Sequence, residues 1–543
     1  MPRTEPPDDP ELSWSGWGDP AEARALPAAL QRLLASGLGV GPPTPLPASI
    51  DDLELTPVRL ADAAASALTA IVGGDHAHAD HEARVRHALG KSTPDLLALR
   101  SGEPIPAPDL VVMPGSHEEV LAVLGECSRR RVAVVPFGGG TSVVGGLVPE
   151  SGGFTGWVAL DVRRLDQLVA LDEESRLATL GPGLRGPAAE RLLSPRGYTI
   201  GHFPQSFEYA SLGGFAAARS SGQSSAGYGR FDDLVMGVKV ATPAGPLNLG
   251  RAPKSAAGPD LRQLVLGSEG ALGVITELTV AVRPVPERRE YDGWRLADFN
   301  RGLAAVRRLI QDGPRPTVVR LSDEAETALG LAHPEDLRQG GEGGCLAIIG
   351  YEGSQEEVQA TRSAGSRVLE AAGATRVEDA GADWAHGRFA GPYLRDALLD
   401  AGALVETLET VTFWSSVRGL YDSVTGALRA ALSDQGTPPV IICHVSHVYP
   451  AGASLYFTIA CAQLPEPAAQ WRLAKRAASE AILAAGGSIT HHHGVGRDHR
   501  EWLEREIGEL GMQVLQAVKA TLDPVGILNP GILITPQTSI NLG

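Results

Sequence analysis

Residues 132–146 read VAVVPFGGGTSVVGG, and this stretch decides the fold of the chain. An apolar run of β type ends at Pro136 and opens into glycines 138–140, which two hydroxyl residues, Thr141 and Ser142, follow. Glycine lets the backbone approach a ligand closely and adopt positive φ, so that successive N–H groups can point at one anion. The stretch therefore predicts a loop that binds the pyrophosphate of a nucleotide.

Spacing excludes two common phosphate-binding loops. The chain contains no G-x-x-x-x-G-K-[ST] pattern, so the P-loop lysine is missing. Gly138 and Gly140 fit the start of G-x-G-x-x-G, but Val143 occupies the position of the third glycine. A glycine cluster by itself also fits an ordinary tight loop. The flanking segments are needed to distinguish such a loop from a nucleotide-binding one.

The flanking segments favour a ligand site. Residues 108–114 (PDLVVMP) predict a strand, and a capping-box pattern at 116–119 (SHEE) starts a helix that runs to residue 129. Three turns rich in small residues follow downstream: 204–214 (PQSFEYASLGG), 218–222 (ARSSG) and 267–277 (GSEGALGVITE).

These segments, in this order over residues 108–286, resemble the flavin-binding domain of the p-cresol methylhydroxylase / vanillyl-alcohol oxidase superfamily. The resemblance implies an α+β protein. Its flavin-binding domain of vanillyl-alcohol oxidase type has two subdomains, and its α/β cap domain is an antiparallel sheet covered by helices. It also implies that the glycine loop and the later S-x-G-G segment hold the FAD pyrophosphate, and that the E-G-x-L-G-V-I-T turn holds the adenine and ribose side. The cofactor-binding residues expected on this basis are Pro136, Phe137, Gly138, Gly139, Gly140, Thr141, Ser142, Pro204, Gln205, Ser206, Ser211, Gly213, Gly214, Ala218, Arg219, Ser221, Gly222, Glu269, Gly270, Leu272, Gly273, Val274 and Ile275.

Within that superfamily the chain is similar, over residues 14–529, to the alkyldihydroxyacetonephosphate synthase (alkylglycerone-phosphate synthase) family. The segments that carry this likeness are 14–18 (WSGWG), 201–206 (GHFPQS), 393–396 (YLRD), 406–410 (ETLET), 456–457 (YF) and 488–496 (SITHHHGVG). The resemblance implies a transferase of ether-lipid biosynthesis, which exchanges the acyl group of acyl-dihydroxyacetone-phosphate for a long-chain alcohol through a flavin N5 adduct. Gln205 and Ala210 stand where the family usually has Asp and Ser or Thr, which puts the identity of the substrate in question.

Composition is consistent with such an enzyme. A formal net charge of −17 argues against nucleic acid and anionic membrane surfaces as partners. The four cysteines are dispersed without a C-x-x-C pattern, and no signal peptide or apolar run of about 18 residues is present. We expect a cytoplasmic enzyme that acts on a small lipid precursor or a hydroxyacid, has no integral membrane segment and forms a homodimer.

Breaker clusters and apolar patterns divide the chain into four parts. Residues 1–100 form an N-terminal arm with helical signals at 21–35 and 78–90, and residues 101–286 form the FAD-binding domain. Residues 287–522 form the cap or substrate domain, and residues 523–543 return to the flavin domain. Strands are expected in the cap at 317–321, 345–352, 440–449 and 454–461, and helices at 301–312, 354–372, 466–485 and 502–522.

Three consecutive histidines, His491, His492 and His493, are the first candidates for catalysis. On a strand the middle ring would face away from the outer two, so the run cannot converge on one metal without a turn. His444 and His447, three residues apart on a predicted strand, would also face opposite ways, and we expect no metal. General acid or base chemistry beside the flavin is the favoured role, and a buried or exposed structural cluster is the alternative.

Three further residues owe their roles to the resemblance. Tyr456 matches the catalytic tyrosine of the family, although a phenol needs a tuned pKa to act as acid or base; the residues alone favour an ordinary aromatic on a cap strand. Arg395 matches the arginine that contacts the substrate phosphate, a role that suits a guanidinium, and the alternative is a charge on a helix surface. Arg320 matches another substrate-binding arginine, and a structural ion pair is equally consistent with its position.

The resemblance also bears on FAD attachment and on the main alternative function. No His or Cys lies within residues 136–146, so non-covalent FAD is expected, with His202 and Cys127 as residues that could alter this. The alternative is an FAD-dependent 2-hydroxyacid dehydrogenase of D-lactate or D-2-hydroxyglutarate type. Such enzymes usually carry E-H-G and G-N-L-H segments, where this chain has His492-His493-Gly494 and Ser454-Leu455-Tyr456.

Overall fold

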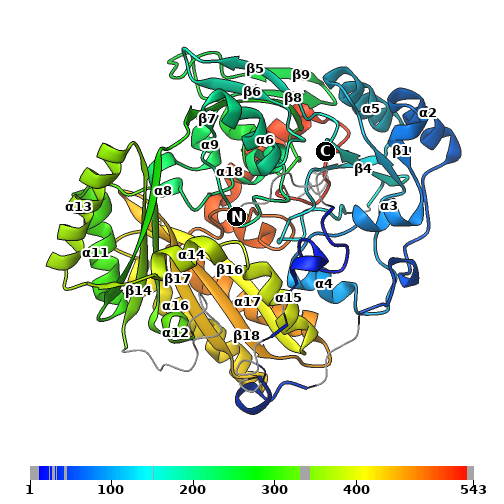
Figure 1. The fold of residues 1–543 in the computed structure, drawn as a ribbon. Helices are drawn as coiled ribbons and strands as arrows, with labels where there is room; N and C mark the ends of the chain where they lie inside the picture. Colours follow the sequence, from blue (N-terminus) through cyan, green and yellow to red (C-terminus); the bar gives the residue numbers. More distant parts are fainter. Residues whose placement is uncertain are drawn as a thin grey trace.

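The computed structural model describes residues 11–534 except 24, 27–30, 32–33, 42–45, 151 and 330–342. Two smaller sheets, drawn in blue to green, lie together, and a larger sheet in green to orange lies across from them (Figure 1). Within the described residues, no helix is both long enough and apolar enough to cross a membrane.

The first small sheet carries the glycine loop. Its strands, in order, are β1 (Ala77–His78), β2 (Leu110–Val112), β4 (Trp157–Asp161) and β3 (Ala133–Phe137), and β2 and β3 run parallel to β4. Two helices, α2 (Asp62–Val72) and α5 (His117–Arg130), pack on it through a core that includes Leu68 and Val120. The hydroxyl of Ser116 accepts from the amide of Glu119 at 3.1 Å, which confirms the predicted helix start.

The second small sheet is antiparallel and has a separate core. Its strands, in order, are β5 (Leu168–Asp172), β6 (Leu177–Leu180), β10 (Val274–Ala281), β8 (Val235–Thr242) and β9 (Gly245–Leu249). Apolar side chains of α6 (Gly186–Leu193) and α7 (Leu212–Ala218) complete that core. Strands β7 (Tyr198–Thr199) and β11 (Arg283–Pro284) form a separate two-stranded sheet, and Tyr198 packs against the same core. The two cores confirm the expected pair of subdomains.

The large sheet is antiparallel throughout, as predicted. Its seven strands, in order, are β15 (Thr375–Val377), β12 (Arg288–Leu296), β14 (Cys345–Gly353), β13 (Val318–Ser322), β17 (Val440–Val448), β18 (Gly452–Ala462) and β16 (Ala403–Phe413). Four long helices pack on it, namely α11 (Phe299–Gln311), α13 (Gln355–Ala371), α16 (Val417–Asp434) and α17 (Pro467–Ala484).

Alternation along the central strands separates a helix face from a cavity face. Cys443, Leu455 and Phe457 are buried in the core that includes the covering helices. Their neighbours His444 and Tyr456 line the cavity on the other side. Because side chains alternate along a strand, the apolar core and the candidate site are set by the same register.

The four cap strands and four helices expected from the sequence are present as β13, β14, β17, β18, α11, α13, α17 and α18 (Arg500–Leu522). Strands β12, β15 and β16 and helices α14 (Ala380–Gly387), α15 (Gly391–Asp400) and α16 were not predicted from the sequence. The remaining short helices are α3 (His81–Arg86), α4 (Thr93–Ala98), α8 (Ser225–Tyr228), α9 (Phe231–Leu234), α10 (Arg262–Val265) and α12 (Glu324–Leu329), with 3-10 turns at Pro20–Glu22, Ile50–Asp52, Gly74–His76 and Ser194–Arg196.

The N-terminal arm differs from the expectation. Much of the helix predicted over 21–35 lies outside the described residues, and the described part holds a 3-10 turn and a π-helical turn at Leu34–Leu38. The helix predicted over 78–90 is α3 alone, because Asp80 caps its start by accepting from the amide of Ala83 at 3.0 Å. The preceding residues instead form β1.

The end of the described chain pairs with the strand that leads into the glycine loop. After α18, the amide of Val134 donates to the carbonyl of Ile527 at 2.8 Å, and the amide of Asn529 donates back to Val134 at 2.8 Å. The Asn529 side chain then donates to the carbonyls of Gly146 and Glu269 at 3.1 and 2.8 Å. This segment therefore ties the glycine loop to the turn before β10.

Candidate functional site

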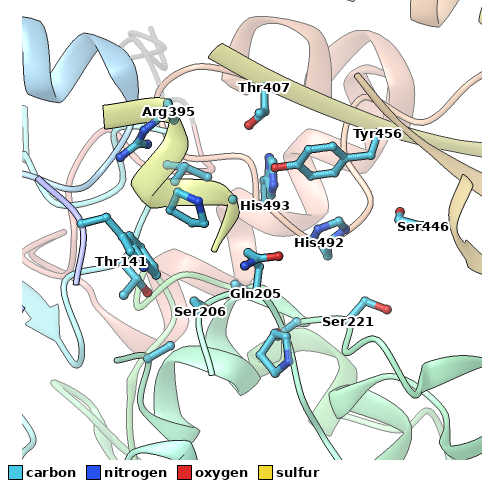
Figure 2. A pocket seen from close by; sticks show the side chains of 18 of the residues that line it. Thr141, Gln205, Ser206, Ser221, Arg395, Thr407, Ser446, Tyr456, His492 and His493 are labelled. Atoms are coloured by element: carbon cyan, nitrogen blue, oxygen red, sulfur yellow. The ribbon is translucent and has the colours of Figure 1, made fainter. Parts of the chain in front are cut away.

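One cavity of about 770 Å³ lies between the cavity face of the large sheet and the loops of the two small sheets. Thr141, Gln205 and Ser206 border it on one side, and Tyr456, His492 and His493 border it on the other (Figure 2). The glycine loop and the candidate catalytic residues, which are more than 300 positions apart in the sequence, thus share one cavity.

The glycine loop packs too tightly for side chains. A Cβ at Gly139 would overlap the carbonyl oxygen of Tyr209, and a Cβ at Gly138 would overlap the hydroxyl of Ser211. Gly140 has φ +70°, a conformation that L side chains rarely adopt. The loop therefore presents bare backbone to the cavity.

The amides of this loop fit a bound anion. Among the described residues, no protein oxygen accepts from the amides of Gly139, Gly140, Thr141 and Ser142, all of which border the cavity. Clustered backbone N–H groups are a known setting for phosphate. The pyrophosphate of FAD supplies such an acceptor, so these residues fit the expected cofactor.

Most of the other expected cofactor-binding residues also line the cavity, but three do not. The Arg219 guanidinium donates to the carbonyls of Leu266 and Gln263, both at 2.8 Å, and so fastens α7 to a neighbouring turn. Leu272 is fully buried in an apolar cluster, and Gly222 packs against the backbone of Phe203. These three residues support the walls of the cavity from outside it.

The histidine run lies on an irregular loop between α17 and α18. The rings of His492 and His493 line the cavity, whereas His491 lies behind them. His491 shares one hydrogen bond between its Nδ1 and Nδ1 of His492 at 2.9 Å, and another between its Nε2 and the hydroxyl of Tyr449 at 2.6 Å. The loop turns, so the strand geometry assumed for the run does not apply.

Burial keeps these rings neutral. It lowers the pKa of His492, partly offset by the nearby Glu409 carboxylate, and lowers the pKa of His493 to about 3. Burial also lowers the pKa of His491 well below its usual value. At neutral pH the three rings are therefore uncharged, and each has one unprotonated nitrogen that acts as an acceptor.

Tyr456 has the opposite property. Burial raises its pKa to about 12, so the phenol is protonated at neutral pH and is a donor. Its ring lies beside that of His493 (Figure 2), edge to face with centroids 5.5 Å apart. It also stacks on the ring of His444, with centroids 5.0 Å apart. Tyr456 and His492 and His493 thus place a protonated phenol and uncharged imidazoles on one wall of the cavity.

The expectation that His444 and His447 face opposite ways is wrong. The register of β17 against β18 shifts between Val445 and Val448, which marks a bulge, and both histidines line the cavity. His447 stacks on His491 at 5.2 Å, and its Nδ1 bonds the hydroxyl of Ser225 at 2.9 Å.

The bulge also completes a cluster that could hold a metal ion. His447, His491 and His492 each place one ring nitrogen within 4.8 Å of the other two. His447 supplies the third nitrogen that the run itself lacks. Structural zinc sites have four protein ligands and catalytic ones three, so the geometry alone does not require a metal.

Arg320 lines the cavity while it makes an ion pair. Its guanidinium donates to Glu326 at 2.7 Å and to Nδ1 of His444 at 3.1 Å. Burial alone would raise the pKa of Glu326, but the charge of Arg320 and the hydrogen bonds from His444 and Ser322 keep that pKa well below its usual value. This is the structural pairing that the sequence left as an alternative to substrate binding.

Arg395 lies on α15 at the junction with the N-terminal arm. Its guanidinium donates to Asp396 at 2.7 and 2.9 Å and to the carbonyl of Lys91, and it borders the cavity. Asp396 also accepts from the amide of Trp17 at 2.5 Å. Trp17 is buried against Tyr209, so the WSGWG segment packs on the body of the protein.

Two residues that organise the site were missed. Glu409 lies on β16, a strand that was not predicted from the sequence. Its carboxylate accepts hydrogen bonds from three backbone amides of the histidine run. Tyr449 holds His491. The available signal for Glu409 was a charged residue inside the apolar run 403–413, since a buried carboxylate needs partners.

Two family models match the chain. Residues 108–248 match the FAD binding domain, and residues 285–533 match the C-terminal domain of FAD linked oxidases. The alkyldihydroxyacetonephosphate synthase of Dictyostelium discoideum is 35% identical over 84% of this chain and 78% of its own length. That of Trypanosoma brucei brucei is 31% identical over 97% of this chain and 93% of its own length.

Solved structures agree with these matches. A crystal form of alkyldihydroxyacetonephosphate synthase is 30% identical, with a TM-score of 0.80 over 96% of this chain and 98% of that one. p-Cresol methylhydroxylase, at 15% identity and a TM-score of 0.65 over 91% of this chain and 98% of that one, shares the fold. A mitochondrial D-lactate dehydrogenase of Arabidopsis thaliana is less similar, at 28% identity over 79% of this chain and 74% of its own. The chain is therefore an FAD-dependent enzyme and belongs to the alkyldihydroxyacetonephosphate synthase family.

Proposed function

We propose that this enzyme exchanges the acyl group of acyl-dihydroxyacetone-phosphate for a long-chain alcohol, giving alkyl-dihydroxyacetone-phosphate. The observation that carries the proposal is one cavity that joins an anion-binding glycine loop, a cationic Arg395 and the Tyr456–histidine wall. The names of the relatives with which the chain shares most of its length support the same reaction.

Arg395 is the proposed anchor of the substrate phosphate. A guanidinium recognises phosphate through paired N–H donors, and Arg395 borders the cavity with its head held in place by Asp396 and Lys91. Apolar residues of the same region, Leu398 and Val405, offer a surface for a hydrocarbon chain. The substrate is expected to lie between Arg395 and Tyr456.

The proton at C1 of the substrate is proposed to move to the histidine run. The rings of His492 and His493 are neutral and face the cavity, so either can accept that proton. Tyr456, which burial keeps protonated, is a hydrogen-bond and proton donor to the oxygen that leaves or enters. The base is therefore assigned to a histidine and the acid to Tyr456.

FAD is proposed to bind non-covalently. When bound, it supplies the isoalloxazine ring at which the acyl and alkyl groups are exchanged. Neither of the two residues that could alter the attachment borders the cavity. Cys127 is buried in the core of the first small sheet, and His202 packs between Phe215 and Phe231.

An FAD-dependent 2-hydroxyacid dehydrogenase is the second candidate. The cluster of His447, His491 and His492 favours it, because such dehydrogenases use a metal to bind the substrate carboxylate. The absence of the E-H-G carboxylate at His492-His493-Gly494 weighs against it.

An anaerobic comparison separates the two functions. The protein is incubated with acyl-dihydroxyacetone-phosphate labelled in its acyl chain and with hexadecanol, and in parallel with D-lactate or D-2-hydroxyglutarate. Release of labelled fatty acid that depends on the alcohol, with the flavin spectrum restored at the end, supports the synthase. Bleaching of the flavin by either hydroxyacid, without exchange, overturns it in favour of the dehydrogenase.

The domain boundaries at residues 100, 286 and 522, a cytoplasmic location and a homodimeric assembly complete the proposal. The four cysteines are buried and free, which supports a reducing compartment. Light scattering of the purified protein tests the assembly.

A further inference from the structure

The carboxylate of Glu409 gathers four consecutive residues of the histidine loop. One oxygen, Oε1, accepts from the hydroxyl of Thr490 at 2.6 Å and from the amides of His492 and His493 at 3.1 and 2.9 Å. The other, Oε2, accepts from the amide of His491 at 2.7 Å. Four consecutive residues therefore donate to one buried carboxylate.

The position of Glu409 follows from the sheet. Glu409 on β16 is paired directly with Tyr456 on β18, so the two side chains leave the sheet on the same face. The Glu409 carboxylate lies 3.7 Å from Nδ1 of His492 and 4.0 Å from Nδ1 of His493. This one cross-strand pair therefore positions both Tyr456 and the histidine loop that faces it.

A second carboxylate holds the far end of the same loop. Glu269, in the turn before β10, accepts from the amide of Val495 at 2.7 Å and from the amide of Gly496 at 2.9 Å. Gly494, between the two carboxylates, has φ +92° and lies against Glu269. The loop is thus fastened at one end to the large sheet and at the other to the flavin-binding side.

We propose that Glu409 is the positioning residue of the active site, which sets the distance and orientation of His492 and His493 relative to Tyr456. The assignment rests on the proposed function, in which these histidines and Tyr456 move the proton. Glu409 does not border the cavity, so it acts on the reaction only through the loop. A shift of the loop by about 1 Å is enough to lower a rate by about 100-fold.

The chain offers a matched control on the same strand. Glu406, three residues before Glu409, is equally buried, and its carboxylate accepts from the amides of Thr93 and Thr407, each at 2.7 Å. Both substitutions, Glu409→Gln and Glu406→Gln, remove a buried carboxylate from β16. Only the first removes contacts to the histidine loop.

The test combines hydrogen exchange with kinetics on the FAD-loaded full chain. In Glu409→Gln, the amides of residues 491–493 are expected to exchange at least about tenfold faster than in the wild type. Per bound flavin, kcat for alkyl exchange is expected to fall by about 100-fold, while KM for acyl-dihydroxyacetone-phosphate changes less than about threefold. Glu406→Gln should leave the exchange of residues 491–493 unchanged and kcat within about threefold of wild type.

Three results would overturn the inference. The first is an unchanged rate of amide hydrogen exchange at residues 491–493 in Glu409→Gln. The second is an unchanged kcat per bound flavin in Glu409→Gln, with only the FAD content lowered. The third is an equal loss of kcat in the Glu406→Gln control. If Glu409→Gln does not fold, Thr490→Val decides, since it removes one of the four hydrogen bonds. It should speed loop exchange and lower kcat by about threefold to tenfold, and no change in either measurement rejects the role. Hydrogen exchange reports on the loop without any turnover. If the wild type does not catalyse alkyl exchange, the proposed function is rejected, but the effect of Glu409 on the loop can still be measured.

Discussion

Glu409 and Tyr456 are direct cross-strand partners on β16 and β18, one under the histidine loop and the other facing the cavity. The pairing of β16 with β18 therefore positions both Tyr456, the proposed acid, and Glu409, which holds the loop of the proposed base. A slip of β16 by one residue would turn Glu409 to the helix face and leave the loop amides without an acceptor. The register of these two strands is therefore a functional property as well as a structural one.

We expect Tyr456→Phe to lower alkyl exchange by about 10²- to 10⁴-fold, because the protonated phenol is the proposed acid. FAD content and the visible spectrum should be unchanged, since the ring and its packing remain. Stopped-flow or labelled-exchange assays measure this. Tyr421→Phe is the control, because the Tyr421 hydroxyl donates to Asp323 at 3.0 Å on the helix side of the sheet. Unchanged turnover of Tyr456→Phe would remove this residue from the mechanism.

Arg395→Ala should weaken recognition of the substrate phosphate. We expect KM for acyl-dihydroxyacetone-phosphate to rise by at least about 100-fold, the order expected for a lost charge-assisted pair. The comparison substrate is acyl-dihydroxyacetone, which lacks the phosphate. If Arg395 binds phosphate, the wild type prefers the phosphorylated substrate and the variant does not. A preference that survives in the variant would place the phosphate elsewhere, with Arg320 as the next candidate.

Gly139→Ala should abolish FAD binding. The added Cβ would overlap the carbonyl oxygen of Tyr209, so the loop would have to move away from its packing partner. We expect a colourless protein that takes up no FAD, measured by absorbance near 450 nm. Gly152→Ala is the control, because a Cβ there meets nothing within 4 Å. Acid precipitation of the yellow wild type should release all of the flavin, and flavin that remains in the pellet would contradict non-covalent binding.

Stability should depend on pH through Glu269. Burial raises the pKa of this carboxyl from 4.5 to about 7, against the effect of the Gly496 and Val495 amides, which lower it. The folded protein thus binds the proton more tightly than the unfolded chain. This contribution is complete below pH 4.5 and is lost as the pH rises to about 7.

The measurement is the free energy of unfolding of wild type minus that of Glu269→Gln. We expect this difference to fall by about 3 kcal/mol between pH 4.5 and 7 and then to stay level. A difference that rises with pH in this window would show that Glu269 is stabilised as an anion.

We expect the purified holoprotein to contain less than about 0.1 equivalents of zinc, iron or manganese. Both ring nitrogens of His491 already have partners, Tyr449 and His492, and the oxygens of Glu409 are used by the loop. Elemental analysis before and after dialysis against zinc checks this. One equivalent that is retained by wild type and lost in His447→Ala would instead establish a metal site.

Local patterns predicted the flavin-binding side well. Ser116 caps its helix, and most glycines of the loop and of the later turns border the cavity, because turn chemistry depends on near neighbours in sequence. The cap was harder. Four of its strands were predicted, but β16 was not, since Glu406 and Glu409 interrupt the apolar pattern of residues 403–413.

The partners of these carboxylates explain why. Thr93 lies 313 positions from Glu406, and His491 lies 82 positions from Glu409, so the burial of both depends on tertiary contacts that periodicity does not report. The same holds for His447, whose direction is set by a bulge against β18. For Arg320, the sequence left open an ion pair or substrate binding. Its ion-pair partner Glu326 is only six positions away, whereas the cavity that Arg320 also lines is formed by residues distant in sequence.

The attachment of residues 490–496 to two separate parts of the molecule limits how substrates can enter. A hinge motion that separated the large sheet from the flavin-binding loops would move Glu409 away from Glu269. The hydrogen bonds that the loop amides donate to one of these carboxylates would then break. Such an opening would separate the proposed acid, Tyr456, from the proposed base. We therefore expect long-chain substrates to enter the cavity without separation of the large sheet from the flavin-binding loops.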